Sequence, residues 1–301
     1  MTHGFFPVSY KVCQVLGIQG GFPLEIREIR PGFVAEAVGN NREILAGRDG
    51  DVVKKALLSY SVVIMRGMEL APTEQVALTR LLGPPEIVTD MRNHHPESTD
   101  ILVVRNAGAT PVVGNTHWHS DRSFLPEPTR YTVLRADVVP EEGGDTLFAD
   151  MTAAYRELGD EWRPVIDGAE AVHSYDTVAR LRARAHGAPL EQGYARKYPP
   201  TVHPLVRAHP ESGTPALYLN ELCVASLHRP DGKPVTVGVA ELHEYATRER
   251  FVHRHRWRRG DVVVWDNSRV LHRAGDLPPG LPRVLHRTTT AGAPPYAPAE
   301  G

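Results

Sequence analysis

The chain has 301 residues, of which 41% are hydrophobic, and its 34 Lys and Arg residues nearly balance its 36 Asp and Glu residues. This length allows one enzyme-sized domain with a large core, and the balanced charge disfavours nucleic acid and membrane surfaces as partners. No apolar run reaches the roughly 20 residues that cross a bilayer. The first residues lack the features of a secretory signal, and two cysteines make no disulfide framework. The cytoplasm is the expected location.

Hydrophobic periodicity and turn residues predict a mixture of helices and strands in chain order. Helices are expected over residues 51–60, 73–82, 151–158, 162–166 and 238–250. Strands are expected over 61–65, 101–105, 131–138, 146–149, 202–206, 216–219, 251–257, 261–265, 271–272 and 283–290. The strands over 251–257 and 261–265 are expected to form a hairpin. Many short strands with few helices favour an α+β fold, either a β-sandwich or a jelly roll with flanking helices.

Two polar stretches interrupt this pattern. Residues 84–99 are predicted to be a loop, and residues 173–200 a longer irregular segment that serves as a lid loop, since loops of this length in compact domains are often functional. The whole chain, 1–301, is expected to form one domain in which residues 1–48 and 291–301 are peripheral.

The first chemical signal is the pair His119 and Asp121. In a strand, residues two apart point to the same face, so an imidazole and a carboxylate would lie side by side. Such a pair is two-thirds of the two-histidine, one-carboxylate triad that binds non-haem iron(II). His272 is the candidate for the third ligand. His117 shares the predicted face and competes as a ligand, although packing or hydrogen bonding nearby is the favoured reading.

Basic and hydroxyl side chains supply the second signal. Arg283 and Arg287 are four residues apart, so a strand would place them on one face, and arginine binds carboxylates as a bidentate fork. Thr146 follows a glycine turn. The alternatives without a binding role are a solvated sheet edge for the two arginines and an ordinary turn residue for Thr146. The basic residues between 180 and 197 fit either a solvated lid or a patch that recognises an anionic substrate, and the solvated lid is favoured.

Several ordered motifs between residues 61 and 290 resemble the taurine dioxygenase/TfdA-like family of iron(II)- and 2-oxoglutarate-dependent dioxygenases. These motifs are Trp118-His-Ser-Asp121, Gly143-Gly-Asp-Thr-Leu-Phe-Ala-Asp150, His203-Pro-Leu-Val-Arg-Ala-His-Pro-Glu-Ser-Gly213, and His255-Arg-Trp-Arg-Arg-Gly-Asp-Val-Val-Val-Trp-Asp-Asn267 followed by Leu271-His-Arg-Ala274. The resemblance implies a double-stranded β-helix (jelly-roll) core. It also implies Fe(II) as the metal, 2-oxoglutarate as co-substrate and O2 as oxidant.

The resemblance further implies His119, Asp121 and His272 as the iron ligands. It implies that Arg283 forms a salt bridge with the far carboxylate of 2-oxoglutarate and that Thr146 donates a hydrogen bond to that carboxylate.

Three positions are implied to lie near the substrate. Arg287 matches a family arginine near the co-substrate and the anionic end of the substrate, and Asn115 matches a substrate-contacting asparagine. His94 and His95 fall in the segment that corresponds to a substrate-contacting loop. Residues 92–95 differ from taurine-type sequences, which argues against taurine itself.

The implied reaction oxidises, most often hydroxylates, a C–H bond of a small polar or anionic molecule while 2-oxoglutarate becomes succinate and carbon dioxide. Desaturation and cyclisation use the same chemistry. The unmatched segment 92–95 and the lid favour a tailoring step in secondary-metabolite biosynthesis over taurine-type sulfonate catabolism. The alternative from another class is a jelly-roll protein that binds a metal or ligand without turnover, but a co-substrate anchor at Arg283 and Thr146 would serve no purpose there. The expected partner is a small-molecule substrate, and a homo-oligomer is compatible with the sequence.

Overall fold

The structure is a computed structural model that describes residues 12–13, 24–39, 44–45, 50–88, 93–106, 115–185, 189–190 and 193–299. Its main feature is a nine-stranded sheet. In spatial order the strands are β1 (Val12–Cys13), β2 (Glu25–Arg30), β3 (Val34–Val38), β4 (Val62–Met65), β15 (Val262–Asp266), β7 (Tyr131–Val138), β17 (Arg283–Thr289), β6 (Ser98–Asn106) and β5 (His94–His95). The pairings are antiparallel except for β3 with β4. Among the described residues, no helix is both long enough and apolar enough to cross a membrane.

The centre of the large sheet is buried on both faces, which explains why the sequence of β4 is apolar throughout. Val63 and Met65 pack in a core cluster with helices α2 (Gly50–Ser59) and α3 (Pro72–Leu82). Val62 and Ile64 belong to a second cluster on the opposite face. Because alternate residues of a strand point to opposite faces, a strand covered on both sides reads as a continuous apolar run.

A three-stranded sheet covers the second face of the large sheet. It consists of β14 (Val252–His255), β8 (Thr146–Asp150) and β16 (Val270–Ala274). Phe148 of this sheet packs against Trp265 of the large sheet, with 5.4 Å between ring centroids. Two sheets that enclose an apolar core in this way form the predicted jelly-roll sandwich, so the α+β fold class is confirmed.

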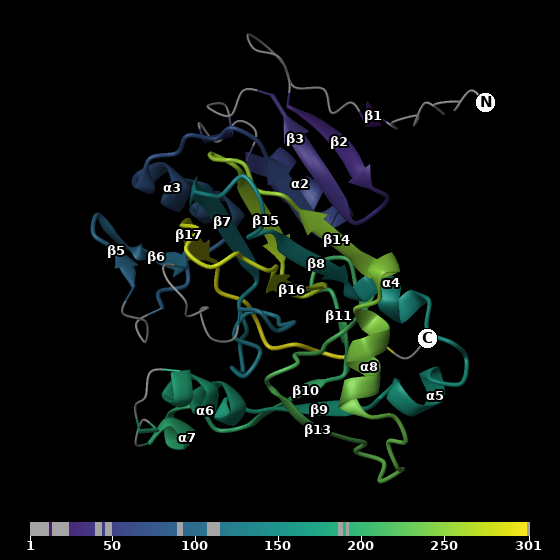
Figure 1. The fold of residues 1–301 in the computed structure, drawn as a ribbon. Helices are drawn as coiled ribbons and strands as arrows, with labels where there is room; N and C mark the ends of the chain where they lie inside the picture. The colour runs from purple at the N-terminus through teal and green to yellow at the C-terminus, as the bar shows by residue number, and fades with distance from the viewer. Residues whose placement is uncertain are drawn as a thin grey trace, which may run out of the picture.

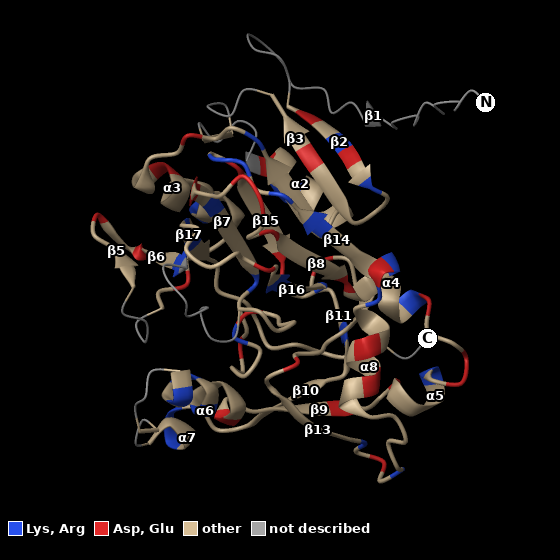
Figure 2. Ribbon diagram, in the orientation of Figure 1, with Lys and Arg blue, Asp and Glu red and all other residues tan. Residues whose placement is uncertain are grey.

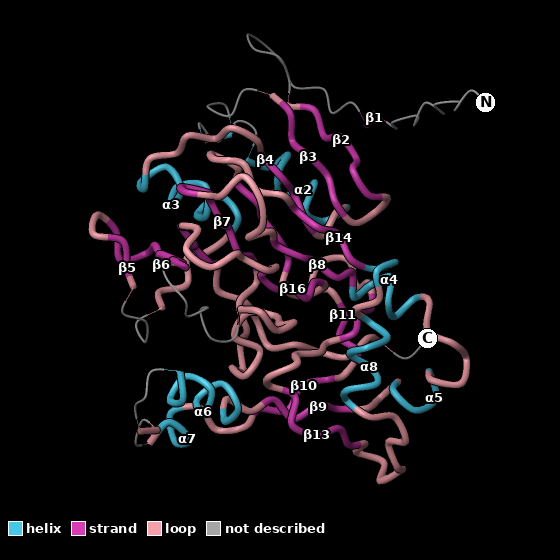
Figure 3. Tube along the Cα trace, viewed as in Figure 1, coloured by secondary structure: helices cyan, strands magenta, loops and turns pink. Residues whose placement is uncertain are grey.

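The remaining elements form a lower lobe in the view of Figure 1. A sheet of β10 (Thr201–Pro204), β9 (Glu170–His173) and β13 (Val224–His228) lies there with the pair β11 (Val206–Ala208) and β12 (Pro215–Leu217). The helical elements α4 (Met151–Arg156), α5 (Arg163–Ile166), α8 (Val239–Ala246) and η1 (Glu249–Phe251) pack with them around a third apolar cluster. Helices α6 (Asp176–Ala185) and α7 (Tyr194–Lys197) lie together on the other side of the lobe (Figures 1 and 3).

Three local predictions are wrong. The segment 173–200, expected to be irregular, contains α6 and α7, and an ion pair between Asp176 and Arg180 supports the first turn of α6. The segment 84–99, expected to be a loop, contains β5 and the start of β6. Finally, β14 and β15 are no hairpin, because β14 pairs with β8 while β15 pairs with β4 and β7. Gly260, at φ +78°, lets the connection cross from one layer to the other beside Gly67.

Candidate active site

Three side chains from two distant parts of the chain meet between the sheets. His119, Asp121 and His272 each offer a ligand atom, and these atoms all lie within 4.8 Å of one another. Nε2 of His119 and Nε2 of His272 each lie 3.9 Å from Oδ1 of Asp121. Two imidazole nitrogens and one carboxylate oxygen are the donor set of the facial triad that suits non-haem Fe(II).

The backbone that carries this cluster is not a continuous strand. Only His119 forms a bridge, in which its N–H donates to the carbonyl of His272 (3.0 Å) and the N–H of His272 donates back (2.8 Å). Asp121 begins a turn, and Arg122 after it has φ +53°. A positive φ is uncommon for a non-glycine residue and tends to occur at functional sites. The turn, not strand alternation, places the carboxylate beside the two imidazoles.

Backbone contacts fix the orientation of His119. Its Nδ1 lies 2.7 Å from the carbonyl of His117. Because a carbonyl only accepts hydrogen bonds, Nδ1 carries the proton and Nε2 presents its lone pair to the cluster. His117 therefore contributes its backbone and stays outside the group of three converging ligand atoms.

The ionisation states suit a metal ligand set. Burial lowers the pKa of His119, and burial together with the nearby His119 lowers the pKa of His272 well below the usual value. Burial alone would raise the pKa of Asp121, but Arg287 and the two histidines bring it well below its usual range. Neutral imidazoles and an ionised carboxylate are the forms that bind a metal.

Two contacts hold the Asp121 carboxylate. The hydroxyl of Thr132 donates to Oδ2 at 2.6 Å, and Nη2 of Arg287 lies 3.1 Å from Oδ1. Asn267 links this pair to the backbone: its Oδ1 accepts the Asp121 N–H (3.1 Å) and its Nδ2 donates to the Thr132 hydroxyl (2.9 Å). The proximity of Asn267 to Asp121 carried no signal in the sequence.

A cavity on one side of the cluster contains the two predicted co-substrate anchors. Nη2 of Arg283 lies 3.3 Å from the Thr146 hydroxyl, which also accepts the indole N–H of Trp257 at 2.9 Å. With both lone pairs engaged, the Thr146 hydroxyl can donate its proton into the cavity. Burial lowers the pKa of Arg283 to about 10, so its guanidinium stays charged at neutral pH.

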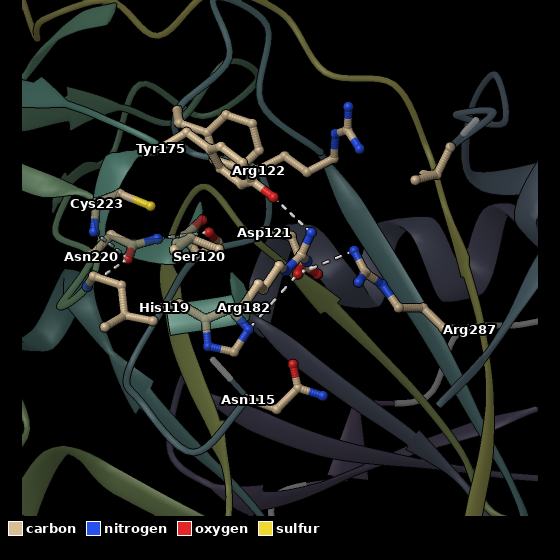
Figure 4. Close-up of a pocket in the computed structure, with 14 residues that line it drawn as sticks. Asn115, His119, Ser120, Asp121, Arg122, Tyr175, Arg182, Asn220, Cys223 and Arg287 are labelled. Atoms are coloured by element: carbon tan, nitrogen blue, oxygen red, sulfur yellow. Dashed lines mark hydrogen bonds and ion pairs between the residues drawn. The ribbon is translucent and has the colours of Figure 1, made fainter. Parts of the chain in front are cut away.

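A second cavity opens on the other side of the cluster (Figure 4). The two cavities share Asn115, His119, Asp121 and Arg287. The second is the larger, at about 110 Å³ against about 50 Å³ for the first. Its remaining wall is largely apolar and aromatic, with two further cations, Arg122 and Arg182, and includes Val88, Phe124, Tyr175, Val178 and Leu222. The triad therefore lies where two chemically different cavities meet.

The structure brings most of the predicted residues together. His94 and His95 are the exceptions among the described residues, because they form β5 at the edge of the large sheet and line neither cavity. His94 contacts the Thr99 carbonyl through Nδ1 at 2.7 Å, and His95 packs against His286. Arg182 was not among the predicted site residues, because the basic run around it was interpreted as solvated.

Comparison with known proteins gives a consistent set of similarities. A family model described as "Taurine catabolism dioxygenase TauD, TfdA family" matches residues 25–289. The alpha-ketoglutarate-dependent 2,4-dichlorophenoxyacetate dioxygenase of Cupriavidus pinatubonensis is 36% identical over 267 residues, 83% of this chain and 91% of that protein. Pentalenolactone F synthase of Streptomyces arenae is 29% identical over 283 residues, 86% of this chain and 93% of that protein. The crystal structure of AAD-2 with Mn(II) and N-oxalylglycine superposes with a TM-score of 0.77 at 30% identity, covering 91% of this chain and 99% of that one.

Proposed function

Because the chain belongs to the TauD/TfdA family of 2-oxoglutarate-dependent dioxygenases, we propose that it oxidises, most often hydroxylates, an unactivated C–H bond of a small polar, anionic molecule. His119, Asp121 and His272 would hold Fe(II), and Arg283 with Thr146 would hold 2-oxoglutarate. The observation that carries the proposal is the position of the triad between a cavity with a buried anion anchor and a larger, mainly apolar cavity.

The donor set fits the metal that the family uses. Both histidines present Nε2, the carboxylate presents Oδ1, and a site with one carboxylate and two neutral imidazoles suits Fe(II). When bound, Fe(II) with O2 and 2-oxoglutarate supplies the oxidation, in which one oxygen atom enters succinate as CO2 leaves and the other enters the substrate C–H bond.

The chain's own residues bind the co-substrate, orient the Asp121 carboxylate and exclude water. The fork of Arg283 and the donated proton of Thr146 suit the far carboxylate of a dicarboxylic acid. Arg287 and Thr132 keep the Asp121 carboxylate turned toward the two imidazoles. Phe124 and Tyr175, whose ring centroids lie 4.6 Å apart, give the larger cavity an aromatic wall that limits the entry of water beside the reacting carbon.

We propose that the biological role is a tailoring step in biosynthesis, and the likeness to pentalenolactone F synthase supports this role. Catabolic oxygenation of an organic acid or sulfonate is the second candidate, and the likeness to the 2,4-dichlorophenoxyacetate enzyme favours it. Succinate release with a panel of aryloxyalkanoates, alkyl sulfonates and lactones would distinguish the two roles.

An anaerobic titration tests the metal and co-substrate assignments. Fe(II) plus 2-oxoglutarate should produce a visible charge-transfer band in the parent protein, and ascorbate-supported turnover should release succinate. His272→Ala should abolish both signals, whereas His228→Ala, which changes a half-exposed histidine paired with Glu170, should keep them. A parent protein with neither the band nor succinate release would contradict catalysis and favour the non-catalytic binding protein.

A further inference from the structure

One side of helix α6 faces the larger cavity. Tyr175, just before the helix, lines that cavity together with Val178 and Arg182, and the spacing of three and four residues places these side chains on one helical face. Arg180 belongs to a different face, where it pairs with Asp176 at 2.7 Å with more than half of its side chain exposed. The basic residues on α6 (Figure 2) therefore divide into a solvated group and one arginine that reaches the cavity.

The guanidinium of Arg182 has a defined direction. Its Nη1 donates to the Tyr175 hydroxyl at 2.6 Å, and its Cζ lies 5.7 Å from the centroid of the Tyr175 ring. Figure 4 shows this contact as a dashed line above His119. Cys223 lines the same cavity. Arg182 is thus a positioned cation within the cavity wall.

Two other arginines line the cavity. Arg122 pairs with Glu86, with 3.0 Å between its Nε and Oε1 of Glu86, and Arg287 pairs with the triad carboxylate. The guanidinium of Arg287 lies 3.1 Å from Oδ1 of Asp121 and lines both cavities. The Arg287 guanidinium is therefore paired with a carboxylate of the triad. Arg182 offers its charge at the wall formed with Tyr175 and Cys223.

We propose that Arg182 is a specificity-determining residue that binds a carboxylate or sulfate group of the substrate. The substrate's aryl or branched apolar body would lie against Phe124, Val178 and Leu222, which line the same cavity. A guanidinium fork matches the geometry of either oxyanion, and apolar walls with a few placed polar groups are typical of small-molecule sites. This inference rests on the proposed function, because it assigns the larger cavity to the oxidised substrate.

The test uses the protein loaded with Mn(II) and N-oxalylglycine, which are inert replacements for the metal and co-substrate. Calorimetry would measure the binding of phenoxyacetate, phenyl sulfate and neutral 2-phenoxyethanol. Both anions should bind the parent complex more tightly than the alcohol. Arg182→Gln should lower the affinity for both anions by about tenfold to a hundredfold and leave the affinity for the alcohol unchanged. Arg182→Lys should fall in between, and Arg180→Gln, a charge loss on the solvated face, should match the parent.

Each other outcome has a definite meaning. Equal losses for all three ligands in Arg182→Gln would mean that the residue only packs, and would overturn the proposal. Equal losses in Arg180→Gln and Arg182→Gln would mean general charge attraction, with the same consequence. Anions that bind the parent no better than the alcohol would also overturn it, and the ratio of phenoxyacetate to phenyl sulfate affinity distinguishes a carboxylate from a sulfate substrate. Failure of the parent to bind Mn(II) or N-oxalylglycine would instead contradict the proposed function.

Discussion

The hydroxyl of Thr132 lies 2.6 Å from Oδ2 of Asp121, which leaves Oδ1 to face the two histidines. Thr132→Val keeps the shape of the side chain and removes this bond. Because outer contacts fix the orientation of metal ligands, we expect Mn(II) affinity to fall about tenfold to a hundredfold, as measured by calorimetry. Thr79→Val is the matched control, since it removes a buried bond to Thr288 away from the triad. Equal metal affinities in the two variants would contradict the role of Thr132.

Arg283 and Thr146 should contribute unequally to co-substrate binding. Arg283→Gln removes the charge that faces a carboxylate and should weaken 2-oxoglutarate by about tenfold to a hundredfold. Thr146→Val removes one neutral hydrogen-bond donor and should lower the affinity for 2-oxoglutarate about fivefold. Titration of 2-oxoglutarate into the Mn(II)-loaded proteins measures both, and Mn(II) affinity itself should stay near that of the parent. Unchanged 2-oxoglutarate affinity in Arg283→Gln would show that the anchor is assigned to the wrong residue.

Gly144 tests how closely the glycine turn approaches the anchor. It has φ +68°, and an added Cβ would lie 2.9 Å from Cδ of Arg283. Gly144→Ala should therefore displace Arg283 and weaken 2-oxoglutarate by about tenfold or more. Gly213 has φ +69° with no atom within 4 Å of an added Cβ, so Gly213→Ala carries the same backbone strain of about 1 kcal/mol without the collision. If both variants weakened 2-oxoglutarate alike, strain alone would account for the effect.

Acid stability should depend on His173, which is fully buried beside His203 and Tyr218. Burial, with smaller contributions from nearby cations, lowers its pKa from 6.5 to about 3. Between these values the unfolded chain binds a proton that the folded protein excludes, so the free energy of unfolding falls as the pH drops. The contribution is about 1.4 kcal/mol per pH unit.

His173→Phe removes that proton and should make the loss of stability between pH 6 and pH 4 shallower in urea unfolding. The loss should persist in part, since burial also lowers the pKa of His203. His228→Phe changes a half-exposed histidine and serves as the control. An unchanged pH slope in His173→Phe would mean that His173 takes no part in acid unfolding.

The sequence predicted that His119, Asp121 and His272 converge and that Arg283 lies near Thr146, because residue type and order were enough to pick out these side chains. Strands such as β7 and β17 were also clear, since turn segments rich in Pro and Gly follow β7 and precede β17. The backbone at Asp121 was harder to predict, because a turn with φ +53° at Arg122 carries no apolar periodicity.

Helix α6 was missed for a different reason. Its sequence is rich in arginine, and Ala179 is its one buried residue. The segment was therefore interpreted as polar and irregular, although its few apolar residues share one helical face. Because this apolar face is narrow, the sequence did not indicate that Arg182 points into the larger cavity. A hairpin of β14 and β15 was predicted because short connections usually join strands that pair with each other. The contact of Gly260 with Gly67, by which this connection passes between the layers, is visible only in the structure.

Backbone hydrogen bonds join His119 and His272 in both directions, so metal binding at this site requires the folded chain. Neither half of the site can hold a metal well until segments far apart in the sequence have reached their final register. By mass action, a ligand that binds only the folded chain stabilises it, by about 1.4 kcal/mol for each tenfold excess over its dissociation constant. Saturating Mn(II) should thus raise the melting temperature of the parent, and the size of that shift gives the metal affinity without any turnover assay.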